Sequence, residues 1–209
     1  MIGRKMKRRW LRRRHDTTGS YTFALSSEYS GMAYSAFITD FLHQAQLPRL
    51  SAQDPLPDKQ LIQQVAVADE HKIAPATGLQ ASCTRSLLLF AGGGIDEAHR
   101  IVQEMSTTDA AYIHGVIHRA DDDFGNARYW FRRARMHPAG AEMYRRAAAN
   151  SLAIAHQPIW DPVLVTDMVE RSRTAGVTEE LRAILTIEFE VLLEFLWTRT
   201  PLSATGFVR

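Results

Sequence analysis

The sequence predicts an all-α protein of stacked helical hairpins, with about seven to eight helices. Alternating runs of Val, Ile and Thr, which mark β-strands, are absent. From residue 77 onward, apolar residues recur at helical spacing, and Gly, Asn or Pro separates one run from the next. The clearest feature is a pair of helices joined by a short turn at residues 110–138.

The chain divides by charge into a basic arm and linker at residues 1–26 and a single helical domain at residues 27–200. Its 209 residues, 45% of them hydrophobic, suit one globular domain. The first 14 residues hold eight basic residues and no acidic one, which leaves 17 basic against 23 acidic residues in the rest. We therefore expect a disordered, basic arm on an acidic body. The basic residues of the arm are Arg4, Lys5, Lys7, Arg8, Arg9, Arg12, Arg13 and Arg14.

Three interpretations of residues 1–14 stay open: a solvated extension, an arm that binds nucleic acid or another anionic surface, and an organelle-targeting segment. The arm lacks the apolar run of a secretory signal. No stretch of the chain is long and apolar enough to predict a transmembrane segment. The only cysteine, Cys83, cannot form an intramolecular disulfide, so we expect a cytoplasmic protein with Cys83 in its core.

The helices are expected in the following order. Weaker helical patterns lie at residues 27–46 and 58–72, and a loop at 48–58 with three prolines separates them. Asp161-Pro162 is a typical helix start. The last helix is apolar on more than one face, which indicates burial between other helices, although we expect its Glu188 to be solvated. The regular helices are predicted at residues 77–90, 96–105, 108–122, 126–137, 140–155, 162–174 and 178–198.

Residues 111–138 resemble a tetratricopeptide repeat in part. Gly115, Ala127, Phe131 and Ala134 fall at that repeat's small and aromatic positions. Small residues allow two antiparallel helices to approach, and the aromatic ring fills the space between them. A weaker copy of the pattern lies 29 residues earlier, which predicts two stacked hairpins. The first Trp and the Tyr of the repeat are missing, so the chain is repeat-like only.

The 110–138 hairpin also carries the densest set of chemically capable side chains. His114 and His118 are four residues apart and share one helix face. This spacing is typical of metal ligands, and His99, His137 or an aspartate could complete a divalent metal site. The Glu of the zinc-protease HExxH motif is absent.

Three other interpretations of the hairpin remain. The histidines and neighbouring Asp and Arg residues could form an acid–base site, because imidazole titrates near neutral pH. The arginines between 119 and 135, with Tyr129 and Trp130, could bind an anionic or aromatic ligand. A purely structural interpretation places the histidines in hydrogen bonds between helices and pairs the arginines with the aspartates at 121–123.

The block from residue 96 to 138 resembles the motif SHxxxQ, YWHxxxHRREGD and NxxYWxRRxxxHP of an uncharacterised family of small helical proteins. The resemblance covers about a fifth of the chain well and implies a site at this block, with no assigned activity. The chain departs from the motif at Ile113, Ala120 and Asp122. The matching residues are His99, Gln103, Tyr112, His114, His118, Arg119, Asp123, Asn126, Tyr129, Trp130, Arg132, Arg133, His137 and Pro138.

The leading functional hypothesis is a repeat-like helical domain that binds a protein or small ligand through a polar and aromatic site on the hairpin. The alternatives are a small metal-dependent or acid–base enzyme using the histidine cluster, and a component of a nucleic-acid assembly anchored by residues 1–14. The predicted ligand- or partner-binding residues are His99, Gln103, His114, His118, Arg119, Asn126, Tyr129, Trp130, Arg133 and His137.

Overall fold

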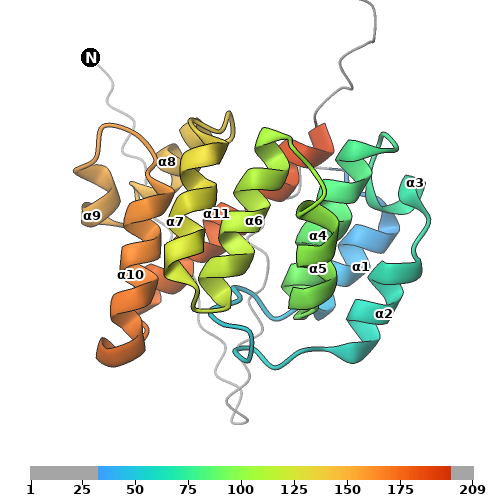
Figure 1. Cartoon of the computed structure of the whole chain (residues 1–209), viewed down its shortest axis with the longest axis horizontal. Helices are drawn as coiled ribbons and strands as arrows, with labels where there is room; N and C mark the ends of the chain where they lie inside the picture. Colours follow the sequence, from blue (N-terminus) through green and yellow to red (C-terminus); the bar gives the residue numbers. More distant parts are fainter. Residues whose placement is uncertain (1–32, 199–209) are drawn as a thin grey trace, which may run out of the picture.

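The computed structural model describes residues 33–198. These residues form helices joined by turns and loops, with no β-strand among them, so the predicted all-α class is confirmed (Figure 1). The helices are α1 (Ala36–Gln44), α2 (Lys59–Val67), α3 (Glu70–Ile73), α4 (Leu79–Gly92), α5 (Ile95–Val102), α6 (Thr108–Ala120), α7 (Phe124–Ala134), α8 (Gly140–Ala147), α9 (Leu152–Ala155), α10 (Pro162–Ala175) and α11 (Glu179–Thr198).

The predicted count of about seven to eight helices is too low, because the described residues form eleven. The predicted helix at 58–72 splits into α2 and α3, where Ala68 is extended and the Asp69 side chain caps a new helix. The predicted helix at 140–155 splits in the same way, where Ser151 caps α9. Asp and Ser side chains accept hydrogen bonds from the first free N–H groups of a helix, so each favours a restart over continuation.

Helices α4 and α5 form one hairpin and α6 and α7 the next, and α5 packs against α6 (Figure 1). Gly93 ends α4 with a left-handed conformation (φ 93°), which glycine adopts without strain. In the second hairpin, Gly115 of α6 faces the Phe131 ring of α7. A Cβ atom at Gly115 would lie 2.8 Å from that ring. The missing side chain therefore allows α6 and α7 to approach closely.

Gly115→Ala is expected to lower the free energy of unfolding by about 1–3 kcal/mol, because the new methyl group would overpack the buried Phe131 ring. Gly125→Ala is the matched control, since a Cβ there meets only a carboxylate oxygen of Asp123, at 3.9 Å. Urea denaturation of both variants measures the difference. Equal stability of the two variants would contradict the proposed close approach of α6 and α7.

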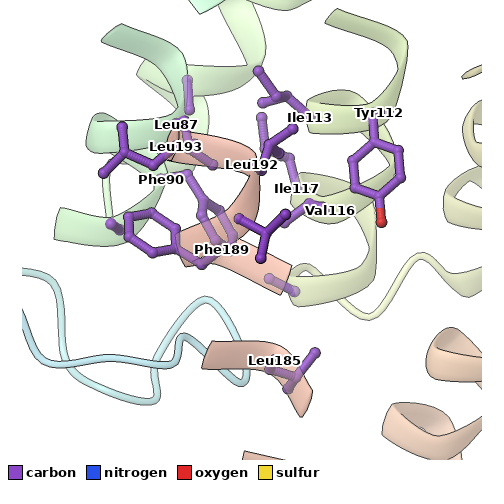
Figure 2. Close-up of a cluster of buried hydrophobic side chains, with 14 of the residues drawn as sticks. Leu87, Phe90, Tyr112, Ile113, Val116, Ile117, Leu185, Phe189, Leu192 and Leu193 are labelled. Carbon is purple, nitrogen blue, oxygen red and sulfur yellow. The ribbon is translucent and has the colours of Figure 1, made fainter. Parts of the chain in front are cut away.

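Helix α11 runs behind the hairpins and supplies much of the core (Figure 1). Its apolar side chains meet those of α4 and α6 in one buried cluster, shown in Figure 2. This confirms the burial expected for the last helix. Cys83 is also buried, as predicted. The labelled members of the cluster are Leu87, Phe90, Tyr112, Ile113, Val116, Ile117, Leu185, Phe189, Leu192 and Leu193.

Helix α10 begins as the sequence predicts. Asp161 caps α10 by accepting a hydrogen bond from the N–H of Val163, and Pro162 occupies the first turn. None of the helices in the range 33–198 is long and apolar enough to cross a membrane. The basic arm at residues 1–14 lies outside the described residues.

Candidate metal centre

Three histidines from two neighbouring helices meet where α5 packs against α6. His99 projects from α5, and His114 and His118 project from successive turns of α6. One ring nitrogen of each lies within 4.8 Å of the chosen nitrogens of the other two. The Nε2 atoms of His114 and His99 are 2.8 Å apart, so one of them carries a proton that it donates to the other. The fold thus adds His99 to the pair that the helical spacing predicted.

The three rings differ in orientation. The His114 and His118 rings are stacked, with 4.8 Å between centroids and 10° between planes. The His99 ring stands nearly perpendicular to both, at 82° to His114 and 87° to His118. A perpendicular third ring can direct its nitrogen toward the nitrogen-bearing edges of a stacked pair. This arrangement gathers ring nitrogens around one point.

Burial keeps two of these imidazoles neutral. The His114 side chain is buried, and burial, together with the nearby His99 and His118, lowers its pKa to about 3. Burial is also the main cause that lowers the pKa of His118, with His99 adding to it and Asp123 opposing it. Neutral imidazole is the form that binds metal ions, so His114 and His118 carry no positive charge to lose near neutral pH. The proton shared by the Nε2 atoms of His99 and His114 would have to move to a ring nitrogen that does not bind the metal.

Neighbouring side chains hold two of the rings in place. The Trp130 ring stacks on His114 with 3.9 Å between centroids and 17° between planes. Asp123 Oδ2 lies 3.5 Å from Nδ1 of His118, while the same carboxylate caps α7 through the N–H of Asn126. A carboxylate that attracts the proton to Nδ1 leaves the Nε2 lone pair of His118 free for a metal.

The donor set can hold a tetrahedral zinc ion once the side chains move, because ligand nitrogens as far as 4.8 Å apart would have to approach by up to about 1.5 Å. Zinc–nitrogen bonds of about 2.0–2.1 Å in a tetrahedron place ligand nitrogens about 3.3 Å apart. The Nε2 atoms of His99 and His114 are closer than this, at 2.8 Å, so they would have to separate by about half an ångström. His99 and His118 are only partly buried, and so their side chains have room to adjust. Among the described residues, no cysteine or carboxylate completes the group, which leaves a fourth position open.

Tyr129, Trp130 and Arg133 of α7 form an aromatic and cationic ledge beside the histidines. The Arg133 guanidinium carbon lies 5.3 Å from the centre of the Trp130 ring and 5.8 Å from that of Tyr129. The Tyr129 side chain is exposed, and its hydroxyl accepts a hydrogen bond from Arg133. Arg133 forms no ion pair with a carboxylate among the described residues. Its charge is therefore free to meet an anionic group near the histidines.

His137 lies apart from the three-histidine cluster. Its Nδ1 accepts a hydrogen bond from the N–H of Ala139, so the proton of the neutral ring is on Nε2, 3.1 Å from Asp109 Oδ1. The ring also packs against Tyr112 at 5.0 Å. Helix α7 ends at Ala134, three residues before the predicted end at 137, so His137 does not continue the face of that helix. These contacts fix the turn before α8.

Arg119 faces the core instead of the histidines. It forms a buried ion pair with Glu188 of α11, which also accepts a hydrogen bond from the Tyr112 hydroxyl at 2.7 Å. Trp160 donates to the same hydroxyl at 2.8 Å. The expectation that Glu188 is solvated is wrong, since its side chain is only 3% exposed. The reason is a partner 69 residues away, which the pattern of one helix cannot reveal.

The remaining predicted residues have separate positions. Asn126 bonds to Asp123 through its side-chain amide, at 2.7 Å, within the cap of α7. Gln103 lies exposed at the end of α5. Arg128 joins α7 to α10 through ion pairs with Asp167 and Glu170. The structure therefore brings together the three histidines with Trp130, Tyr129 and Arg133.

The sequence did not predict the positions that two residues take in the structure. Asp123 was matched to the motif, but its proximity to His118 was not expected, although Asp five residues after His at a helix end is a usable signal. Arg49 is buried beside a cavity, yet it lies in a proline-rich loop without any periodic pattern. Loops give no spacing rule from which such a position follows.

No family model, no curated protein and no solved structure matches the chain, and the motif resemblance to an uncharacterised helical family stays a prediction.

Proposed function

We propose that this protein binds a divalent transition metal, zinc in the first place, through His99, His114 and His118, and that this centre is its functional site. The observation that carries the proposal is the convergence of three ring nitrogens within 4.8 Å of one another. Trp130 stacked on one ring and Asp123 beside another support it, because metal-binding histidines depend on such outer contacts for their orientation.

The number of ligands favours a catalytic or ligand-binding centre over a structural one. Structural zinc sites have four protein ligands, whereas catalytic sites have three and keep the fourth position for water or substrate. Water bound there would become acidic enough to supply hydroxide near neutral pH. We therefore propose metal-assisted hydrolysis as the reaction class. Arg133, on the ledge beside the histidines, would bind the anionic group of the substrate.

Zinc titration of the untagged, full-length protein after chelator treatment tests the proposal. We expect one zinc ion per chain, with strong loss of affinity in His99→Ala. His99 is partly exposed, so its removal should leave the fold intact. The matched control is His156→Ala, an exposed histidine on α9's C-terminal side. Failure of the unaltered protein to bind zinc, or equal binding by the two variants, would refute the proposal.

Asp123→Asn is expected to weaken zinc binding by roughly 10-fold to 100-fold, the usual effect of removing an outer carboxylate from a metal-bound histidine. Asn is as good a helix cap as Asp, so α7 should keep its stability. Calorimetric titration gives the affinity and thermal unfolding of the metal-free protein checks the cap. Unchanged affinity would mean that Asp123 does not orient His118.

The partner-binding hypothesis remains a second proposal, supported by the exposed Tyr129 ring and the unpaired charge of Arg133. Aromatic and arginine side chains are the residues that most often dominate binding surfaces. A Tyr129→Ala/Arg133→Ala variant should lose any bound partner while retaining zinc. If partners are kept by a folded double variant, this surface is not the interface.

A further inference from the structure

We propose that a second, separate site binds the carboxylate or phosphate group of a small organic anion, in the cavity between the 47–57 loop, the start of α2 and the end of α4. The cavity has a volume of about 380 Å³, within the range of small-molecule sites. Arg49 is the buried cation on its wall, and Lys59 stands at its exposed rim. No residue of the histidine centre lines this cavity.

The guanidinium of Arg49 is held rigidly by backbone carbonyls. It donates to the backbone oxygen of Pro55 at 2.6 Å and to that of Ala91 at 3.4 Å. It also donates to the backbone oxygens of Ser51 and Ala52 in the same loop, at 3.3 and 3.4 Å. A Cβ atom at Gly93 would lie 2.7 Å from its Nη2, so the absent side chain leaves room for it. Its Nε is buried without a hydrogen-bond partner among the described residues. One donor of a preorganised group is therefore unused.

Carbonyl oxygens satisfy donors but carry no formal negative charge. Burial consequently lowers the pKa of Arg49 to about 10, with the carboxylate of Asp54 opposing this effect. Asp54 does not approach within ion-pair distance in the described part of the chain. The carboxylate of Asp58 also lines the cavity, but it accepts hydrogen bonds from two N–H groups at the start of α2. A buried cation without a counter-ion is costly, and a bound anion would supply one.

The walls of the cavity define the class of ligand. Pro55, Leu56 and Pro57 form an apolar side, while Gln44, Gln60 and Lys59 offer polar groups. A ligand with one anionic group on a compact apolar body matches both sides. Benzoate and phenyl phosphate are suitable probes, because they share that body and differ only in the anion.

The Nε–H resonance of Arg49 in ¹H–¹⁵N spectra of the full-length protein reports on this site alone, which matters because residues 1–14 can also attract anions. Loss of the resonance in Arg49→Lys assigns it. We expect a saturable shift with at least one probe, and the stronger probe shows whether carboxylate or phosphate is preferred. Lys59→Glu should weaken the interaction by roughly tenfold or more. The matched control is Lys72→Glu, at an exposed lysine of α3 outside the cavity.

Two results would overturn this proposal: an Arg49 resonance that neither probe shifts, or equal affinities in Lys59→Glu and Lys72→Glu. Both variants change exposed lysines, so the test does not depend on the stability of an Arg49 variant. The outcome is independent of zinc binding, because the histidine centre and this cavity share no residue.

Discussion

Glu188→Ala is expected to lower the free energy of unfolding by about 3–5 kcal/mol, the usual cost of leaving one member of a buried ion pair alone. In this chain the change would leave Arg119, whose side chain is 5% exposed, without its carboxylate partner. It would also remove the oxygen acceptor of the Tyr112 hydroxyl, which would keep only the Met143 sulfur at 3.4 Å. Urea denaturation of the full-length protein measures the loss. Glu180→Ala, at an exposed position of α11, should cost less than about 1 kcal/mol.

The double variant Arg119→Met/Glu188→Leu distinguishes the cost of an unpaired buried charge from the cost of lost packing. Apolar replacements of a buried pair are often neutral or stabilising, so most of the lost free energy should return. If Glu188→Ala costs no more than Glu180→Ala, the pair is not desolvated as the structure shows. If the double variant is as unstable as the single one, then shape, and not the unpaired charge, determines the effect.

Zinc is expected to stabilise the folded protein by about 4 kcal/mol when free zinc is about a thousand times its dissociation constant. The three histidines meet only in the folded chain, since His99 and His114 are brought together by the packing of α5 on α6. A ligand that binds only the folded state must raise its stability. Thermal unfolding with and without zinc measures the shift.

His118→Ala should remove this stabilisation, whereas His156→Ala should keep it. The two variants each remove one imidazole, so any weak binding of zinc to the unfolded chain is reduced equally. Equal zinc-dependent shifts in both variants would show that the stabilising metal binds elsewhere.

Much of the fold follows from local sequence patterns. The 110–138 hairpin and the His114–His118 pair, which each depend on one short segment, could be predicted from the sequence. The 110–138 hairpin was predicted from its turn and its small residues, and Gly115 does face Phe131. The pairing of His114 with His118 follows from helix geometry. By contrast, the split of α8 from α9 depends on whether Ser151 caps a new helix or continues the old one. The structure shows the cap, in which the Ser151 hydroxyl accepts a hydrogen bond from the N–H of Ile154.

Which residues belong to the candidate site could be decided only from the tertiary structure. Sequence spacing offered His99 and His137 equally as further ligands. The fold selects His99 because α5 packs on α6, and it diverts His137 to Asp109 because the chain turns after α7. Arg119 shares a helix with the histidines, but the burial of Glu188 on α11 draws it into the core. Each outcome depends on residues that are distant in sequence.

X-ray absorption at the zinc edge tests most directly whether His99, His114 and His118 of one chain hold a metal ion. The untagged protein, loaded with one equivalent of zinc and freed of excess, should show three imidazole nitrogens and one oxygen at about 2.0–2.1 Å. His99→Ala should lose one imidazole from that shell. A shell of oxygens without imidazole scattering, or zinc that is lost during removal of the excess, would contradict a metal centre at these three histidines.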